Sequence, residues 1–186
     1  MVTRTNLYIN GKDAYATWGL QLDGGDQSGY DALLAPKSFK EPVTNKNVTA
    51  QGAVVVCGTG LKDERTVNVP VHIVASSYAE FREKKAKLER FLEYGSAEGE
   101  ADVTPKGKLT IVVKREWRVP GTDYNTEETE FESVMYCLSI NNYSQFSQVQ
   151  NKIYNWRTGQ WVDVDGTGYG IAKFILVLYE PNEPTI

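Results

Sequence analysis

The alternation of apolar and polar residues along the chain predicts strands almost everywhere except in one stretch, residues 76–95. There the apolar side chains recur every three or four residues, which is the period of one face of a helix. We expect Phe81, Leu88, Phe91 and Leu92 to form the buried face of this helix. Glu and Lys residues spaced four apart occupy the opposite side, so the helix is predicted to pack on a sheet with its charged side in water.

The ends of this helix carry residues that bond exposed backbone groups. Ser77 is followed three residues later by Glu80, the pattern of a capping box, in which each side chain bonds a backbone N–H of the first turn. Gly95 offers the left-handed residue that ends many helices. The helix is therefore predicted to begin near Ser77 and to stop before Gly95.

Strand patterns with a period of two lie on both sides of the helix. They cover residues 67–75 and 109–118, a long run at 129–141, and a hairpin at 152–157 and 160–164. A further strand is predicted at 171–179, where an almost uniformly apolar run suits the middle of a sheet. These patterns predict a mainly β (α+β) fold, either a β-sandwich or a partly open barrel with one long flanking helix. The chain has 186 residues, so we expect a single domain over 1–186, with 129–186 as its C-terminal β extension.

Two hairpins are predicted before the helix. In the first, residues 7–9 form a strand, Asn10 and Gly11 accept the positive φ of a tight turn, and residues 14–22 alternate as the returning strand. In the second, the short apolar run at 54–57 pairs with the strand at 67–75.

Residues 23–52 contain apolar side chains without a sustained period, and we interpret them as a long loop or arm. Loops of more than about 12 residues are uncommon inside compact domains and usually have a binding role. Apolar groups left outside a core commonly mark an interface. We therefore expect Tyr30, Leu33, Leu34 and Phe39 to lie at a boundary between subunits.

The net charge, the lengths of the apolar runs and the N-terminal sequence indicate which classes of partner and which location to expect. The formal net charge is −4, and basic residues are interleaved with acidic ones, so no cationic face for nucleic acid is expected. No window approaches the ~20 apolar residues of a membrane span, and the N-terminus does not resemble a signal peptide. We expect a soluble protein that is made in the cytoplasm.

The two cysteines, Cys57 and Cys137, do not have the spacing of a metal or redox motif. They are expected to be ordinary thiols of a reduced compartment, with a single disulfide between them as the alternative. No metal and no cofactor is expected. The Asp163–Gly166 segment resembles only the start of a calcium loop, and the glycines at 166–170 lack the Lys and Ser/Thr of a phosphate loop.

Little in the sequence favours catalysis. His72 is the only histidine, which excludes most nucleophile–base arrangements, and its place on the polar side of a strand predicts a surface or edge residue. The carboxylates Glu127, Glu128, Glu130 and Glu132 could serve glycoside hydrolysis, but neighbouring like charges on a strand more commonly mark a solvated edge. We expect no enzymatic activity.

Three tryptophans leave two interpretations open. Trp117, Trp156 and Trp161 could form a platform on which a sugar ring stacks, or they could anchor packing in a core or an interface. The second interpretation is favoured. The chain is also rich in tyrosine, with 11 Tyr residues, and aromatic residues are common at protein interfaces and at sugar sites.

Three segments carry a resemblance to a known family. They are the opening LYINGKDAYATWGLQL, the tract SGYDALLAPKSFK, and the strand and helix RTVNVPVHIVASSYAEFREKKAKLERFLEYG. Over roughly the first 115 residues this pattern resembles the N-terminal domain of the distal tail (siphovirus tail component) family of long-tailed bacteriophages. The resemblance implies a tail-tube-like fold that assembles as a hexameric ring without catalytic activity.

Two functional hypotheses follow from these observations. The first is a structural phage or prophage tail protein, located in the virion tail, whose partners are further copies of itself and other tail proteins. The alternative is a carbohydrate-binding β-sandwich module that holds a glycan on Trp and Tyr side chains. The first hypothesis explains both the long segment at 23–52 and the aromatic residues, whereas the second explains only the aromatic residues.

Overall fold

The computed structural model describes residues 4–23, 28–39, 43–45, 54–56, 62–94, 107–121, 125–145, 152–155, 160–163 and 171–181. Its helices are α1 (Ala14–Trp18), α2 (Ser28–Leu34) and α3 (Tyr78–Tyr94). Its strands are β1 (Arg4–Ile9), β2 (Lys12–Asp13), β3 (Leu20–Leu22), β4 (Val43–Asn45), β5 (Val54–Val56), β6 (Arg65–Val74), β7 (Lys108–Arg118), β8 (Asn125–Gln145), β9 (Lys152–Asn155), β10 (Gln160–Asp163) and β11 (Ile171–Glu180).

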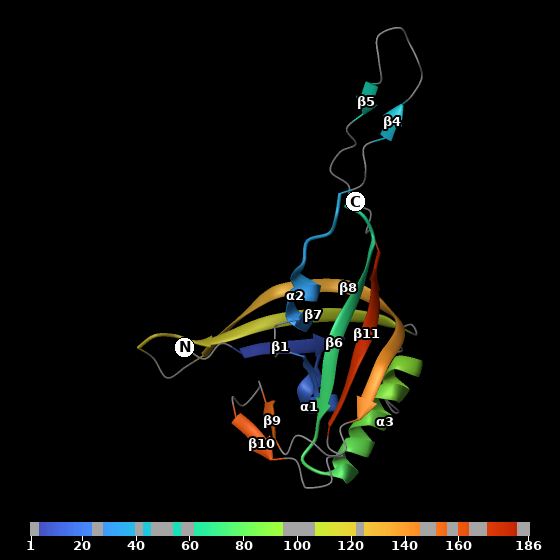
Figure 1. Cartoon of the computed structure of the whole chain (residues 1–186). Helices are drawn as coiled ribbons and strands as arrows, with labels where there is room; N and C mark the ends of the chain where they lie inside the picture. The colour runs from blue at the N-terminus through green and yellow to red at the C-terminus, as the bar shows by residue number, and fades with distance from the viewer. Residues whose placement is uncertain are drawn as a thin grey trace.

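Seven strands form one antiparallel sheet in the order β2-β1-β7-β8-β11-β6-β3. The sheet curls around the core, and α3 lies along one end of it (Figure 1). The prediction of a mainly β fold of the open-barrel or sandwich kind with one long helix is confirmed. β11 lies between β8 and β6, as its nearly continuous apolar run predicted.

The core is built from alternate residues of these strands. The paired strands β6 and β11 contribute Val69 and Leu176, which face each other in register, and β7 contributes Ile111. All three side chains are buried, and they belong to one hydrophobic cluster that also includes residues of the three helices. Because side chains alternate along a strand, the intervening residues lie on the outer face of the sheet.

Helix α3 packs as its period predicted. Phe81, Leu88 and Phe91 are buried, and Leu92 is half-buried against the core, so all four expected residues face inward. The ring of Phe91 lies 4.7 Å from that of Trp18, centroid to centroid, which joins α3 to α1.

The start of α3 is capped slightly differently from a reciprocal capping box. The Ser77 hydroxyl accepts a hydrogen bond from the Glu80 N–H (3.3 Å), as expected. The Glu80 carboxylate accepts from the backbone N–H (2.9 Å) and the hydroxyl (2.6 Å) of Ser76 rather than from Ser77. Hydrogen bonds from Lys84 and then from Ser76 lower the pKa of Glu80 to about 2.

The predicted returning strand at residues 14–22 is wrong in its first half, which is helix α1. The Asp13 carboxylate accepts hydrogen bonds from the N–H groups of Tyr15 (3.0 Å) and Ala16 (3.2 Å) and so caps the helix. Gly19 ends it with φ of 65°, and a Cβ there would lie 2.4 Å from the Val74 carbonyl oxygen. Capping at both ends therefore overrides the alternating pattern, and only β3 pairs as a strand.

The segment at 23–52 is not a continuous loop, because it contains α2 and β4. Leu33 is only 1% exposed and belongs to the core, so its expected place at a subunit boundary is wrong. Tyr30 and Leu34 are half-buried against the same core, which contradicts the expectation that they lie outside it. Phe39, at 69% exposed, is the one residue of this group that remains an interface candidate.

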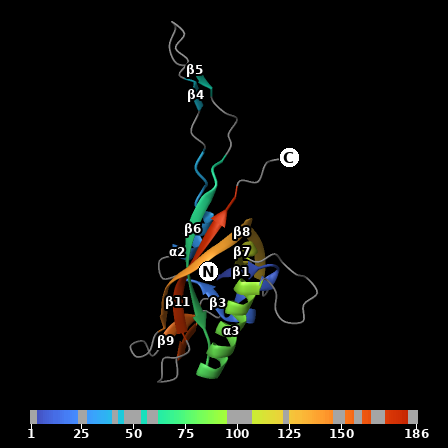
Figure 2. The same ribbon diagram turned by 90° about the vertical axis from the view of Figure 1, so that its right-hand side faces the viewer.

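The second predicted hairpin is also wrong, because β5 pairs with β4 and not with β6. β4 and β5 lie beyond the end of β6, well away from the curled sheet (Figures 1 and 2). A bridge between Phe39 and Lys62 brings the two ends of this segment together. We call the part of the chain between Phe39 and Lys62 the arm.

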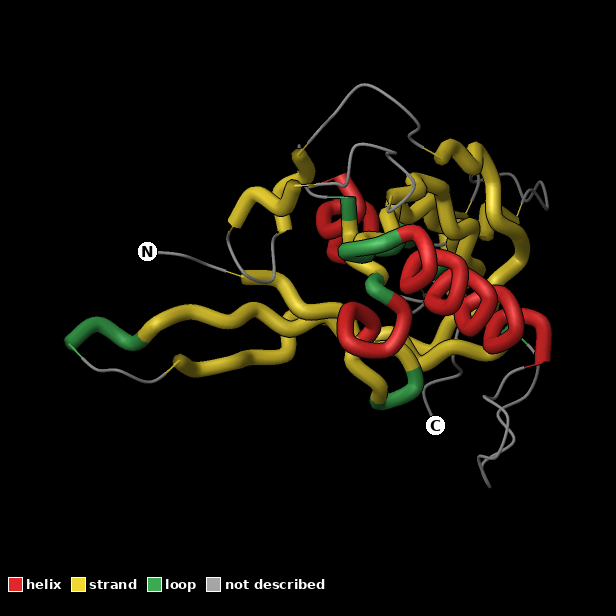
Figure 3. Tube along the Cα trace, turned by 90° about the horizontal axis from the view of Figure 1, so that it is seen from below, coloured by secondary structure: helices red, strands yellow, loops and turns green. Residues whose placement is uncertain are grey.

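The hairpin of β7 and β8 also extends from the sheet, and in the view from below its two strands reach out beyond the other elements (Figure 3). Every residue of β7 pairs with β8, from Lys108 opposite Tyr136 to Arg118 opposite Asn125. The long strand predicted at 129–141 is thus longer than its pattern showed.

Candidate functional site: the root of the arm

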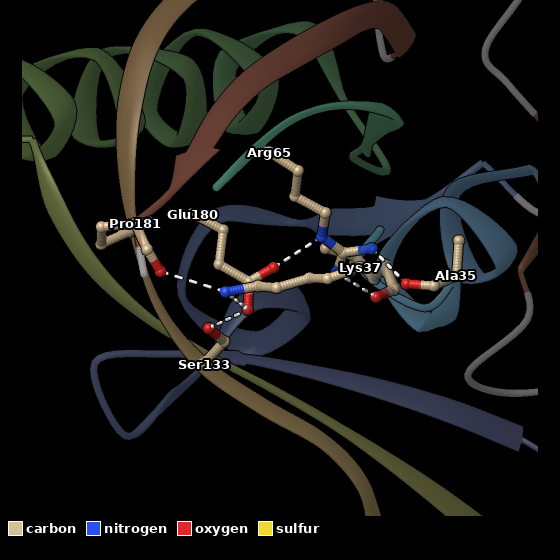
Figure 4. A network of polar contacts seen from close by, with 7 residues as sticks. Ala35, Lys37, Arg65, Ser133, Glu180 and Pro181 are labelled. Carbon is tan, nitrogen blue, oxygen red and sulfur yellow. Dashed lines mark hydrogen bonds and ion pairs between the residues drawn. The ribbon is translucent and has the colours of Figure 1, made fainter. Parts of the chain in front are cut away.

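The root of the arm lies where β6 begins and β11 ends. The Asp63 N–H donates to the Ser38 carbonyl oxygen (2.7 Å), next to the bridge between Phe39 and Lys62. Both ends of the arm therefore leave the domain at one point. The side chains at this point form a network of charged and polar contacts (Figure 4).

The centre of the network is an ion pair between Arg65 and Glu180, the first residue of β6 and the last of β11. The two residues are directly opposite each other in the ladder, and their side chains lie on the core face of the sheet, continuing the row of Val67 and Leu178. Arg65 Nε lies 2.6 Å from Glu180 Oε2. Glu180 is 6% exposed, so this pair is largely shielded from water.

Two more groups engage the second oxygen of the same carboxylate. The Ser133 hydroxyl of β8 donates to Glu180 Oε1 (2.6 Å), and Lys37 Nζ lies 3.3 Å from that oxygen. Lys37 also donates to the carbonyl oxygen of Pro181 (3.0 Å). The carboxylate thus connects β6, β8, β11 and the segment that follows α2.

The charge of Glu180 is retained despite its burial. Burial by itself raises the pKa of a carboxyl group, since it disfavours the charged form. Hydrogen bonds from Ser133 and Arg65, together with the positive charges of Arg65 and Lys37, outweigh burial and hold the pKa of Glu180 below its ordinary value. The network is therefore ionised at neutral pH.

Arg65 also fixes the end of helix α2. Its guanidinium donates to the carbonyl oxygen of Leu33 (2.8 Å) and to that of Ala35. These carbonyls lie at the C-terminus of a helix, where they have no partner within the helix and where a positive charge is favourable. One side chain therefore holds both the last residue of β11 and the segment from which the arm starts.

No local sequence pattern marks this network. Arg65 and Glu180 are 115 positions apart and lie at the ends of two different strands. Only the pairing of β6 with β11 brings them together. Since the carboxylate and the guanidinium each have several partners, the arrangement is suited to holding the chain in place rather than to transferring a proton.

A second polar cluster supports the β7–β8 hairpin and contains one of the four predicted carboxylates. Glu127 accepts hydrogen bonds from Asn6 (3.0 Å), Tyr8 (3.2 Å) and Lys114 (3.0 Å). Burial raises its pKa, but hydrogen bonds from Asn6 and Lys114 outweigh burial and lower the pKa overall. Glu127 thus joins β1 to the hairpin and is not simply a solvated edge residue.

Glu130 belongs to a neighbouring contact that holds Tyr30. Arg115 Nε lies 2.8 Å from Glu130 Oε1, and the Arg115 guanidinium donates to the Tyr30 hydroxyl. Its Cζ also lies 5.5 Å from the centre of the Tyr30 ring. Tyr30 therefore attaches α2 to the hairpin within the chain. The other two carboxylates, Glu128 and Glu132, are exposed, as predicted for a solvated edge.

The prediction that His72 is a surface or edge residue is wrong, since it is 3% exposed and β6 lies between β11 and β3 in the sheet. The alternation along β6 correctly places His72 on the outer face of the strand. Gln21 of β3 lies beside it there, with Gln21 Oε1 3.2 Å from His72 Nε2. His72 Nδ1 lies 3.7 Å from Asp23 Oδ1. Burial lowers the pKa of His72 to about 4, although the negative charge of Asp23 opposes this shift.

The remaining predicted candidates are spread over the chain. Trp117 is half-buried on β7, whereas Trp156 and the side chain of Trp161 lie outside the described residues. Cys137 is a free, half-buried thiol, and burial raises its pKa. Cys57 lies outside the described residues, as do the Asp163 side chain and the glycines at 166–170.

The described part of the chain contains no group of three or more His, Cys, Asp and Glu side chains placed to hold a metal ion. None of its helices has the length and apolar character needed to cross a membrane.

Comparisons with protein-family models, with curated proteins and with solved structures found no match. The resemblance to distal tail proteins and the glycan-binding alternative therefore both stay predictions.

Proposed function

We propose that this chain is a structural protein of a phage or prophage tail that assembles into a homo-oligomeric ring and has no catalytic activity. The observation that carries the proposal is the arm, a pair of strands that lies outside the core and is held at its root by a buried ion network. A pair of strands in this position is suited to contacting another molecule.

The strands of the arm cannot be stabilised by their own pairing. β4 and β5 are three residues long each, and among the described strands they pair only with each other. An isolated two-stranded hairpin is marginally stable at best in water. Burial of the arm against another molecule would supply the missing stabilisation.

The anchored root favours a contact with a defined direction. Arg65, Lys37 and Glu180 hold both sides of the point at which the arm leaves the sheet. A projection on one side of a molecule that meets a different surface of the next copy produces a ring when the rotation closes. We take the number of copies, six, and the location in a virion tail from the resemblance to distal tail proteins.

Assembly of the purified full chain tests the proposal. We expect light scattering to give a mass several times that of the 20.8 kDa chain, and negative-stain microscopy to show closed rings. A monomer at all concentrations, up to the solubility limit and at low and high salt, would contradict it. A glycan array on the same sample would reveal the alternative function, with binding that is lost on Trp117→Ala as its signature.

A further inference from the structure

β3, Asp23 and α2 together cover the side of β6 that faces away from β11. β11 pairs with all ten residues of β6, whereas β3 pairs with residues 71–73. The Asp23 N–H donates to the Pro70 carbonyl oxygen (2.9 Å), and α2 begins so close to β6 that a Cβ at Gly29 would lie 2.6 Å from that oxygen. We call β3, Asp23 and α2 the edge cover.

Polar side chains hold the two ends of the edge cover. At the α2 end, the Arg65 guanidinium donates to the carbonyl oxygens of Leu33 and Ala35. At the β3 end, Gln21 lies opposite His72 in the ladder, and Gln21 Oε1 is 3.2 Å from His72 Nε2. An arginine stays charged in a protein, whereas a histidine can gain a proton as the pH falls. The β3 end is therefore the one that should respond to acid.

The contacts of the His72 ring fit its neutral form. An amide oxygen accepts hydrogen bonds, so His72 Nε2 carries the hydrogen toward Gln21 and Nδ1 keeps its lone pair. His72 Nδ1 is buried, and no described residue forms a hydrogen bond with it. Asp23 Oδ1 lies 3.7 Å from this nitrogen. Two acceptors thus face each other without a hydrogen between them.

A proton on His72 Nδ1 would place a positive charge in this buried position. Asp23 could neutralise the charge, but Asp23 Oδ2 also lies 3.6 Å from Lys173 Nζ, and Lys173 is directly opposite His72 on β11. Burial, together with the charge of Lys173, outweighs the attraction of Asp23 and lowers the pKa of His72 to about 4. The protonated ring is therefore more stable in water than under the edge cover.

β3 is the neighbour of His72 that can open most easily. β11 pairs with β6 on one side and with β8 on the other, whereas β3 is three residues long and lies at the edge of the sheet. Segments with few contacts open locally at a lower free energy than the whole domain. Release of β3 would bring the His72 ring to water and leave the pairing of β6 with β11 intact.

We propose that His72 is a proton-operated latch: its neutral ring holds the β3 end of the edge cover on β6, and protonation of its Nδ1 releases that end. The released part of β6 presents unpaired backbone N–H and C=O groups, to which another strand can pair. Acid thus converts a covered strand edge into a contact surface. This inference is independent of the proposed ring, because it concerns the interior of one chain.

Hydrogen exchange of the full chain, measured by mass spectrometry at pH 7 and pH 4, tests the latch. Each rate is divided by the intrinsic rate at that pH, so that only the opening step is compared. We expect the protection of β3 to fall by about 100-fold, because the opened ring binds a proton with a pKa of 6.5 and the closed ring with one of about 4. In His72→Gln, which has no titrating ring, β3 should keep its protection.

Low concentrations of urea separate local opening from global unfolding. Local opening exposes little surface, so the exchange of β3 should not change with urea. The segment of β7 at residues 109–113, which contributes to the core, should exchange more slowly than β3 and should accelerate with urea, because it is exposed by global unfolding.

The proton itself can be followed, because His72 is the only histidine of the chain. The NMR signal of its imidazole Cε1–H group should titrate with a midpoint well below 6.5. Asp23→Asn leaves the ring in place and removes the negative charge that opposes burial, so it should lower the midpoint further. This variant keeps the latch testable if His72→Gln does not fold.

A midpoint at or above 6.5 would mean that the closed edge cover accepts the proton, which overturns the latch. The latch is also overturned if β3 exchanges only together with β7, since the opening is then global, or if β3 loses the same protection in His72→Gln. None of these results bears on the ring, which is decided by the mass of the assembly.

Discussion

The two hairpins that project from the sheet are stabilised in different ways. The β7–β8 hairpin is paired along its whole length and is joined to β1 by Asn6, Tyr8 and Lys114, which all contact Glu127. In the arm, the described strands β4 and β5 form three pairs, and the buried network of Arg65, Lys37 and Glu180 lies at its root. Side-chain contacts along the strands thus join one hairpin to its neighbours, whereas a buried ion network lies at the root of the other.

A single substitution should therefore destabilise the protein more at the root of the arm than in the β7–β8 hairpin. Loss of one contact in the β7–β8 hairpin leaves the ladder and the other hydrogen bonds in place. Loss of the Arg65 charge leaves the buried Glu180 carboxylate with only part of its compensating positive charge, which is more costly than the loss of an exposed pair.

Arg65→Ala should have the largest effect. It removes the ion pair with Glu180 and the two hydrogen bonds that fix the end of α2, so the free energy of unfolding should fall by about 3–5 kcal/mol, the usual cost of breaking a buried pair. Urea denaturation followed by circular dichroism measures this loss. A midpoint equal to that of the wild type would mean that the root is not anchored as described.

His72 should dominate the pH dependence between pH 6.5 and 4. The unfolded chain binds a proton with a pKa of 6.5 and the folded chain with one of about 4, so the stabilisation is complete above pH 6.5 and is lost as the pH falls toward 4. The loss should be on the order of 3 kcal/mol.

Thermal melts of the wild type and of His72→Gln at a series of pH values test this prediction. The variant should lack the slope in this window, because Gln does not titrate, while Asp23 and Lys173 remain in place. An equal slope in both proteins would assign the pH dependence to other groups.

Glu180→Gln should reduce the acid sensitivity of the protein at lower pH. The pKa of Glu180 is depressed in the folded state, so its stabilisation is present above the ordinary value of 4.5 and is lost as the pH falls below it. The same substitution at Glu127, whose pKa is also lowered, should change the acid slope less, because this side chain is more exposed. Both should be measured in the His72→Gln background, which removes the transition at higher pH.

Lys114→Ala should have the smallest effect. Its pair with Glu127 is accessible to water, and Asn6 and Tyr8 continue to contact the same carboxylate. We expect the urea midpoint to stay within the scatter of repeated measurements. A loss as large as that of Arg65→Ala would remove the contrast between the two hairpins.

Long, locally encoded elements could be predicted from the sequence alone. The period of α3 continues over several turns and its start carries Ser77, so local patterning was sufficient to identify its buried face. The turn at Asn10 and Gly11 could be predicted for the same reason, since both residue types accept a positive φ. The central strand β11 could be predicted because its residues are almost uniformly apolar.

Short elements and long-range pairs were decided only by the tertiary structure. α1 and α2 are five and seven residues long, too short for a helical period to show, and they depend on caps and on packing against β3 and β6. The arm arises because β5 pairs with β4 rather than β6, a choice between strands of similar pattern. Arg65 meets Glu180 because strand register depends on the whole sheet and not on any single segment.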